Sequence, residues 1–363
     1  MRILVWGFSN NLAGTEAVVS NYIGRINRIA FDVVSYEETP SYAPLFTGSN
    51  NLIVIPRKSS SPLRYQRALD SVFRKAAASY DGIWCNINSY ANIDCLKLAE
   101  HYGIQTRIIH AHNSAPVGGA RTKLLHKLNR RAALTLATER WACSQEAGKW
   151  FFGDLSYTLI PNAIDYTAYA YSDRMRADFR RALNLPDAKL LIGAMGRISE
   201  QKNHGWLIKL AEELLRARID FKIVVFGDGE QKGALSSKIE AAGLDECLSI
   251  HKPTSNVRGA LSAMDVYVIP SLFEGLPLSL LEAQANGLPC LASDAVSRDA
   301  AISDQCHFLS LNKVDDWVRA IQHARRFDFR ADYPRACKYS LNHQAMRLED
   351  LFYQTVKGND AIE

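Results

Sequence analysis

The chain has 363 residues, of which 47% are hydrophobic and 22% are charged, and its formal net charge is +5. This length exceeds one ordinary hydrophobic core, so we expect two domains in a soluble globular protein. No apolar run approaches the roughly 20 residues that a membrane span needs, and the first residues do not form a signal peptide.

The positive charge lies in the first half of the chain. Residues 1–163 hold 18 Lys and Arg against 11 Asp and Glu, whereas the remaining residues hold 25 against 27. The first half is therefore expected to meet an anionic partner or surface. The seven cysteines are scattered singly with no C-x-x-C pair, which predicts a reduced, cytosolic compartment.

The first elements predict a Rossmann-like unit. An apolar strand at residues 3–6 leads into a polar turn through Gly14, and residues 15–26 have the apolar spacing of a helix. The turn lacks G-x-G-x-x-G, so it is not a dinucleotide fingerprint. Gly14 either brings backbone N–H groups to a phosphate or serves as a plain turn glycine.

Strands and helices continue to alternate through the first half. Apolar strands are expected at residues 31–34, 51–55, 82–85 and 106–109, with helices between several of them. This alternation predicts a parallel sheet covered on both faces.

Two basic stretches stand out in this half. Residues 57–75, from Arg57 to Lys75, contain six cations and one acid, and residues 121–131, from Arg121 to Arg131, interleave cations with leucines. The second pattern is that of a basic amphipathic helix, which suits an anionic membrane surface or, equally, a solvated helix face.

A second unit is predicted after Pro161-Asn162, which breaks the pattern as an interdomain crossing would. A charged helix at residues 173–183 precedes apolar strands at residues 189–195, 221–226, 248–250, 265–270 and 289–293. An amphipathic helix is expected at residues 341–356.

The stretch from Glu274 to Glu282 is the first candidate site. It follows the strand at residues 265–270, and Pro277 is expected in the first turn of the next helix. Helical side chains lean toward the N-terminus, so Glu282 is predicted to approach the helix start that Glu274 borders. Free N–H groups there favour an anion, so two carboxylates beside them suit a sugar nucleotide. The alternative is one capping and one solvated glutamate.

A second candidate pair, Arg197 and Lys202, lies on the loop after the strand at residues 189–195. Two cations at the carboxyl end of a strand can hold a diphosphate. This loop and the Glu274 loop leave the same ends of strands in one sheet, where open α/β folds bind their ligands.

Taken together, these motifs resemble a known family. Gly196-Arg197, Gln201-Lys202-Asn203, Gly227-Asp228-Gly229 and Glu274-x7-Glu282 occur in the order and spacing of the retaining glycosyltransferases of family 4, which have the two-domain GT-B fold. The resemblance implies an α/β protein with two Rossmann-like domains facing across a cleft. Residues 1–163, completed by residues 341–363, would bind the acceptor, and residues 164–340 would bind the donor.

The resemblance also assigns roles to residues of the donor half. Arg197 and Lys202 would bind the donor diphosphate, Glu282 the ribose, and Glu274 the donor sugar and phosphate. The set of donor contacts is completed by Gly14, Asn203, Gly227, Asp228, Gly275, Leu276 and Pro277.

His110 and His112 follow the strand at residues 106–109. In the family a histidine at this point contacts the transferred sugar or the acceptor; His110 is the first choice and His112 the second. No third ligand at useful spacing accompanies the pair, and no Asp-x-Asp metal motif is evident. We therefore expect a metal-independent enzyme without cofactors, in which the acceptor hydroxyl attacks from the face that the diphosphate leaves.

The donor is expected to be a UDP-sugar, with GDP-mannose as the alternative. The expected acceptor is a lipid-linked glycan at the inner face of the bacterial plasma membrane, as in capsule, O-antigen, lipopolysaccharide or exopolysaccharide synthesis. We expect peripheral membrane contact and no nucleic acid partner. A GT-B sugar-nucleotide epimerase and a non-catalytic sugar-nucleotide sensor remain alternatives. Trp6, Trp84, Tyr90 and Trp141 are open candidates for stacking on sugar.

Overall fold

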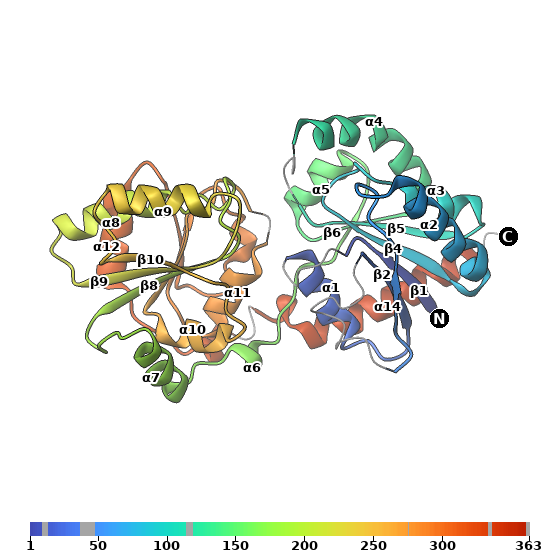
Figure 1. Cartoon of the computed structure of the whole chain (residues 1–363). Helices are drawn as coiled ribbons and strands as arrows, with labels where there is room; N and C mark the ends of the chain where they lie inside the picture. Colours follow the sequence, from blue (N-terminus) through green and yellow to red (C-terminus); the bar gives the residue numbers. More distant parts are fainter. Residues whose placement is uncertain (9–13, 37–47, 114–118, 275, 333–335, 361–363) are drawn as a thin grey trace. The chain divides into compact units, whose positions relative to one another are not determined.

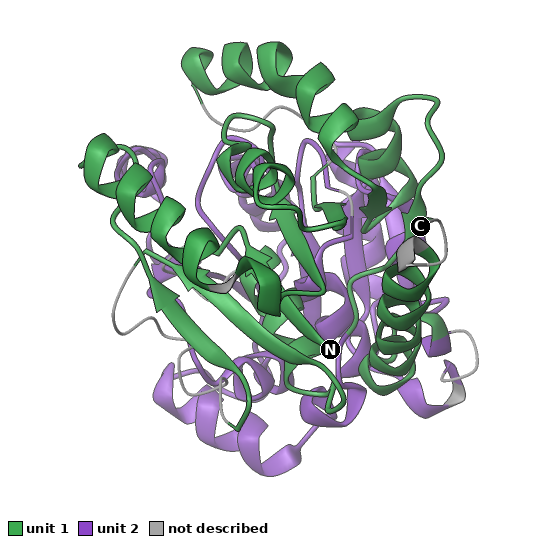
Figure 2. Cartoon of the chain, turned by 90° about the vertical axis from the view of Figure 1, so that its right-hand side faces the viewer, with its two compact units in different colours: residues 1–163, 338–363 green, residues 164–337 purple. Residues whose placement is uncertain are grey.

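The computed structural model describes residues 1–8, 14–36, 48–113, 119–274, 276–332 and 336–360. The chain divides into two compact units (Figure 2). Unit 1 comprises residues 1–163 and 338–363, and unit 2 comprises residues 164–337.

The described residues of unit 1 form a seven-stranded sheet in the order β3-β2-β1-β4-β5-β6-β7, with every neighbouring pair parallel (Figure 1). Its central strands are buried because helices cover both faces. The strands are β1 (Arg2–Trp6), β2 (Ala30–Ser35), β3 (Asn51–Val54), β4 (Gly82–Ile87), β5 (Thr106–Ala111), β6 (Glu139–Ala142) and β7 (Thr158–Leu159).

Helices pack on both faces of this sheet. They are α1 (Thr15–Ile23), α2 (Pro62–Ala76), α3 (Asp94–His101), α4 (Ala120–Leu136), α5 (Gln145–Phe152) and α14 (Leu341–Asp360). On one face, Phe352 of α14 packs edge-on against Trp84 and Trp141, with ring centroids 5.3 and 5.1 Å away. On the other face, side chains from α2, α3 and α5 form a buried cluster with the strands.

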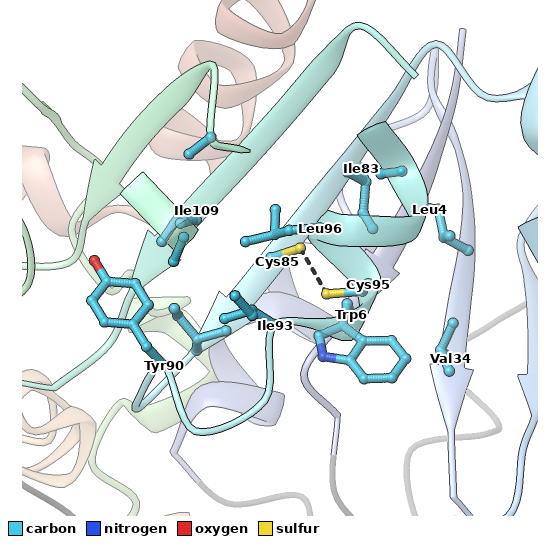
Figure 3. Close-up of a cluster of buried hydrophobic side chains, with 14 of the residues drawn as sticks. Leu4, Trp6, Val34, Ile83, Cys85, Tyr90, Ile93, Cys95, Leu96 and Ile109 are labelled. Carbon is cyan, nitrogen blue, oxygen red and sulfur yellow. Dashed lines mark hydrogen bonds between the residues drawn. The ribbon is translucent and has the colours of Figure 1, made fainter. Parts of the chain in front are cut away.

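Figure 3 shows the centre of that cluster. Leu4, Ile83 and Ile109 come from three strands, and Leu96 comes from α3. The Sγ atoms of Cys85 and Cys95 lie 3.3 Å apart, and both thiols are buried. This face therefore holds the sheet to its helices by apolar packing.

The helix α14 follows unit 2 in the sequence but packs in unit 1. The Arg28 guanidinium lies 3.0 Å from the Glu349 carboxylate, and the Tyr353 hydroxyl donates to the Arg28 carbonyl at 3.0 Å. Phe352 is fully buried. The sheet of unit 1 is thus covered by a segment that is synthesised after the whole of unit 2.

The described residues of unit 2 form a six-stranded parallel sheet in the order β10-β9-β8-β11-β12-β13. The strands are β8 (Leu190–Met195), β9 (Phe221–Phe226), β10 (Leu248–His251), β11 (Val266–Ile269), β12 (Cys290–Ser293) and β13 (Cys306–Leu309). The helices are α6 (Tyr166–Tyr169), α7 (Asp173–Ala182), α8 (Trp206–Arg216), α9 (Lys232–Ala241), α10 (Val257–Ala263), α11 (Leu278–Ala285) and α12 (Val314–His323).

Both sheets reverse their strand order at one place, which positions the candidate sites. In unit 1 the reversal lies between β1 and β4, and in unit 2 between β8 and β11. At such a switch point the loops from two adjacent strands diverge, and open α/β sheets bind ligands there. Two Rossmann-like parallel sheets were predicted, and the structure confirms them.

The element boundaries differ from the predicted ones mainly at helix ends. The first helix ends at Ile23, ahead of Gly24, and the last one extends to Asp360. Pro277 does not lie in the first turn of α11 as predicted but precedes it as the N-cap, because its backbone is extended with ψ 118°.

Candidate active site

An ion pair spans the switch point of unit 2. Lys202, on the loop after β8, places its Nζ 2.7 Å from Oε1 of Glu274, on the loop after β11. The two side chains are 19% and 11% exposed, so they reach solvent only at their tips. The hydroxyl of buried Ser271 donates to the same carboxylate oxygen at 3.2 Å. The structure therefore brings together two residues that the sequence placed 72 positions apart.

The two loops are also joined through their backbones. The Gln201 carbonyl accepts a hydrogen bond from Leu272 N–H at 2.8 Å, and its side-chain amide donates to the Phe273 carbonyl at 3.1 Å. Asn203, whose φ is +52°, donates to the Pro270 carbonyl at 3.1 Å. Asn203 is thus placed to hold the loops together, which fixes the position of Lys202.

The glycines of this site allow a close approach of two backbones. A Cβ on Gly227 would lie 2.1 Å from the Gly196 carbonyl oxygen, and a Cβ on Gly229 would lie 2.4 Å from the Ile198 carbonyl oxygen. Ile198 N–H donates to the Asp228 carbonyl at 2.8 Å. Side chains at 227 and 229 would therefore push the Arg197 loop away from β9.

Arg197 lies at the outer side of this loop. Its Nε donates to the Glu230 carboxylate at 2.9 Å, and the two side chains are 73% and 54% exposed. An exposed pair of this kind contributes little to stability, so Arg197 can exchange Glu230 for another anion at small cost. His204 is buried nearby, and burial followed by repulsion from Lys202 lowers its pKa to about 4. Lys202 therefore faces a neutral imidazole at physiological pH.

Glu282 lies on α11 and meets a partner that the sequence did not indicate. Its carboxyl is hydrogen-bonded by the Tyr169 hydroxyl from α6. Burial raises the pKa of Glu282 to about 7, and the bond from Tyr169 opposes that rise. Glu274 and Glu282 thus have different partners, and burial favours the protonated form of Glu282.

The residues between Glu274 and Glu282 form the end of the loop after β11 and the start of α11. Leu276 is 5% exposed, and Pro277 accepts a hydrogen bond from Leu280 N–H at 3.1 Å. Gly275 lies outside the described residues.

The switch point of unit 1 carries polar but mostly uncharged groups. Gly7, after β1, has φ +109° and crosses β4 so closely that a Cβ would lie 1.7 Å from the Asn86 carbonyl oxygen. Thr15 and Asn88 hydrogen-bond across the switch point, with the Asn88 amide donating to the Thr15 Oγ1 at 3.3 Å. Gly14 precedes α1 with φ +62°, a backbone that favours glycine.

The two histidines differ in exposure. His110 is fully buried, and its ring stacks on Trp84 at 5.9 Å and meets Trp141 edge-on at 6.3 Å. His112 is only partly buried, and its Nε2 lies 2.9 Å from Oδ1 of Asn86. Burial lowers the pKa of His112 to about 3, and burial followed by His112 holds the pKa of His110 well below its usual range. Both imidazoles are neutral at physiological pH, and His112 is the more exposed of the two residues.

The four aromatic candidates for sugar stacking are core residues. Trp6 is 3% exposed, and Trp84, Tyr90 and Trp141 have no exposed surface. Among the described residues, no group of three or more His, Cys, Asp or Glu side chains could hold a metal ion. In the same part of the chain, no helix is both long and apolar enough to span a bilayer.

Comparison with known proteins identifies the second half of the chain. Residues 175–324 match the family model described as glycosyl transferases group 1. This segment holds the Arg197, Lys202, Glu274 and Glu282 positions. The chain carries a glycosyltransferase group 1 domain and is a glycosyltransferase.

Three curated relatives extend this similarity. The glycosyltransferase is 28% identical over 331 residues to EpsF of Bacillus subtilis, which is named as a glycosyltransferase, covering 86% of this chain and 85% of that protein. It is 27% identical over 172 residues to the Escherichia coli UDP-Gal:alpha-D-GlcNAc-diphosphoundecaprenol alpha-1,3-galactosyltransferase, covering 46% and 44%. It is 24% identical over 310 residues to the amylovoran biosynthesis glycosyltransferase AmsD of Erwinia amylovora, covering 83% of each. Its relatives thus include glycosyltransferases of bacterial polysaccharide biosynthesis.

The fold is shared with a solved structure, HepE from Anabaena in complex with UDP-glucose. The TM-score is 0.76 at 18% identity, and the match covers 99% of the glycosyltransferase and all of HepE. This likeness confirms the predicted GT-B-type fold.

Proposed function

We propose that this glycosyltransferase moves a sugar, with retention of anomeric configuration, from a UDP-sugar to a lipid-linked glycan in cell-surface polysaccharide synthesis. The observation that carries the proposal is the Lys202–Glu274 pair at the switch point of the group 1 domain. It places a cation and a carboxylate together where α/β folds bind nucleotides.

The donor roles follow from the chemistry of the residues in unit 2. The cations of Arg197 and Lys202 suit the diphosphate, which would replace the carboxylates of Glu230 and Glu274 as their partner. Glu282 suits the ribose hydroxyls, because a carboxylate accepts hydrogen bonds from them. Glu274, released from Lys202, would then accept from a hydroxyl of the donor sugar.

The choice of uridine is supported by two of the compared proteins. HepE is described in complexes with UDP and with UDP-glucose, and the E. coli relative is named for UDP-Gal. The latter name also specifies a diphosphoundecaprenol acceptor, which supports a lipid-linked acceptor here.

The proposed reaction has one bond formed and one broken. The acceptor oxygen bonds to the anomeric carbon on the face that the diphosphate leaves, and the bond from that carbon to the phosphate oxygen breaks. The departing phosphate oxygen takes the proton of the acceptor hydroxyl. Arg197 and Lys202 stabilise the negative charge that develops on the diphosphate, so we propose that no divalent ion is needed. His112, which is neutral and partly exposed, would hydrogen-bond the sugar through Nε2 in place of Asn86.

We further propose that unit 1 contacts the anionic inner face of the plasma membrane. The exposed cations of α2 and α4 lie within the two basic stretches, 57–75 and 121–131. Peripheral contact would bring the enzyme to an acceptor that is anchored in the bilayer.

Thermal unfolding with UDP, GDP, ADP and CMP, each with and without EDTA, tests the donor site, because a ligand raises the midpoint according to its occupancy. We expect UDP to raise the midpoint, the rise to survive EDTA, and the Lys202→Ala variant to lose most of it. A rise with GDP alone would replace the UDP-sugar by GDP-mannose. No rise with any nucleotide would contradict the donor site itself.

A further inference from the structure

The helix α4 has an outward face of leucines among cations. Leu124 and Leu128, four residues apart on one side of the helix, are 58% and 67% exposed. The exposed cations around them are Arg121, Lys123, Lys127 and Arg131. Within the described part of the chain these four cations form no ion pair. Apolar side chains among unpaired cations match a bilayer with anionic headgroups, which takes up both kinds of group.

The other basic stretch is less suited to this partner. On α2, Arg74 pairs with Asp70, and Lys58, which precedes the helix, lies 2.5 Å from Asp94. Part of its positive charge is therefore neutralised within unit 1. The structure thus distinguishes two stretches that are equally basic in sequence, and it favours α4.

The opposite side of α4 holds the loop between β4 and α3, residues 88–93, which we call the β4–α3 loop. The Tyr90 N–H donates to Nδ1 of His126 at 3.2 Å. The side-chain amide of Asn129 donates to the Tyr90 carbonyl at 2.9 Å and to the Ala91 carbonyl at 3.4 Å. Tyr90 itself is fully buried, and its ring lies 5.0 Å from that of His126.

His126 can act as an acceptor only when Nδ1 is unprotonated. Burial, and then the nearby Arg130, lower the pKa of His126 below its usual value. At neutral pH the imidazole is therefore available to the Tyr90 N–H. Two residues further along a helix correspond to a rotation of about 200°, so His126 faces away from Leu124.

The first residue of the same loop, Asn88, lies at the switch point of unit 1. Asn88 hydrogen-bonds Thr15, at the start of α1, and the strand before the loop carries Asn86, the partner of His112. A continuous set of contacts therefore runs from the outward face of α4, through His126 and Asn129, to the edge of the sheet where an acceptor would bind.

We propose that His126 and Asn129 are positioning residues that fix the β4–α3 loop to α4, so that seating α4 on an anionic bilayer also orders this loop. The proposal rests on the proposed function, in which the acceptor is held at the membrane. Its consequence is that the acceptor edge is held more firmly where lipid-linked acceptors occur.

Hydrogen–deuterium exchange of the full chain, with and without phosphatidylglycerol–phosphatidylcholine vesicles, tests the coupling. In the parent we expect these vesicles to slow exchange both in α4 and in the β4–α3 loop, the latter by about fivefold, which corresponds to one net hydrogen bond. Vesicles of phosphatidylcholine alone should leave both segments unchanged.

The variants separate the two halves of the proposal. His126→Leu and Asn129→Ala should keep the vesicle-dependent protection of α4 and lose that of the loop. Leu124→Ser with Leu128→Ser should lose both, as measured by vesicle flotation and exchange. Thr135→Ala, an exposed change on the same helix, should alter neither. The quantity compared is the change in exchange rate that the vesicles cause. A substitution that loosened the loop equally with and without vesicles would leave this change unaltered.

Four results would overturn parts of the argument in distinguishable ways. Vesicle binding without loop protection in the parent would remove the coupling but leave the membrane contact. Loop protection that survives both His126→Leu and Asn129→Ala would remove the role of these residues. Absence of vesicle binding would contradict the membrane contact itself, while the nucleotide-dependent unfolding midpoint would still report on the donor site. Protection of α4 that rises with protein concentration, without lipid, would assign this face to a second copy of the chain.

Discussion

The two units place different chemistry at the same point of the same topology. In both, the strand order reverses after the first strand of the sheet, and the loops from two adjacent strands carry the candidate residues. In unit 2 a lysine–glutamate pair at 2.7 Å spans this point, whereas in unit 1 a threonine and an asparagine span it. Charges suit a diphosphate, and neutral hydrogen-bonding groups suit hydroxyls. The fold therefore provides the location, and the side chains on the loops determine which kind of ligand group each switch point suits.

The largest effect should come from breaking the charged pair. Lys202→Ala should lower kcat/KM for transfer from a UDP-sugar by about 10²-fold or more, because one preorganised charge contact to the leaving group is lost. Glu274→Ala should cause a loss of the same size. Steady-state rates with each variant measure this, and Lys209→Ala, an exposed lysine on α8, is the matched control. Rates near those of the parent in either variant would contradict the assigned roles.

The stability of unit 2 should depend on pH through Glu282. The pKa of Glu282 is raised to about 7, so between its unfolded pKa near 4.5 and pH 7 the folded state binds more protons than the unfolded state. Stability from this group is therefore present at low pH and is lost as pH rises through 7, by no more than about 3 kcal/mol. The fall in thermal midpoint from pH 5 to pH 8 should be smaller in Glu282→Gln. An equal fall in both proteins would show that Glu282 does not titrate in this range.

Substituting each of the two histidines of unit 1 would distinguish a functional role from a structural one. His112→Ala should lower transfer by about tenfold, the effect of losing one net hydrogen bond to the sugar, with a small change in thermal midpoint. His110→Ala should mainly lower the midpoint, because it removes a buried ring between two tryptophans. Measuring kcat/KM and the midpoint for both variants distinguishes the roles. If His110→Ala lost activity while keeping its thermal midpoint, His110 would be assigned as the histidine that contacts the sugar.

The smallest effect is expected at the exposed edge of unit 2. Arg197→Ala should weaken UDP binding by about tenfold and leave the thermal midpoint of the free enzyme nearly unchanged, because its pair with Glu230 is exposed. Calorimetric titration with UDP checks the first statement, and Arg216→Ala, another exposed arginine of unit 2, is the control. Unchanged UDP affinity would leave Lys202 as the principal diphosphate contact.

The sequence was sufficient where topology alone decides proximity. Lys202 and Glu274 follow strands of one parallel sheet, and the carboxyl ends of such strands share an edge, so their proximity could be predicted. The choice between His110 and His112 could not. The last four residues of β5 are all buried, so the alternation that separates inward from outward side chains on a half-buried strand is absent.

Other residues escaped prediction because their partners depend on tertiary structure. Tyr169 belongs to a helix of four residues, too short for any periodic pattern, and yet it bonds Glu282. Glu230 and Ser271 carry no motif, although they bond Arg197 and Glu274. Likewise, only the structure shows that Lys58 is paired with Asp94 while Lys123 and Lys127 of α4 remain exposed. A signal was present only for Gln201, which lies inside the motif that includes Lys202.

The position of α14 has a consequence for the order in which the protein matures on the ribosome. Domains usually fold as they emerge, with the N-terminal one first. Here Phe352, which covers Trp84 and Trp141 of the unit 1 sheet, is translated only after all of residues 164–337. Unit 2, which is contiguous, has every strand it needs before that moment. The later-translated unit is therefore expected to reach its native state first, and a nascent chain arrested before α14 should display a native unit 2 together with a unit 1 that still binds chaperones.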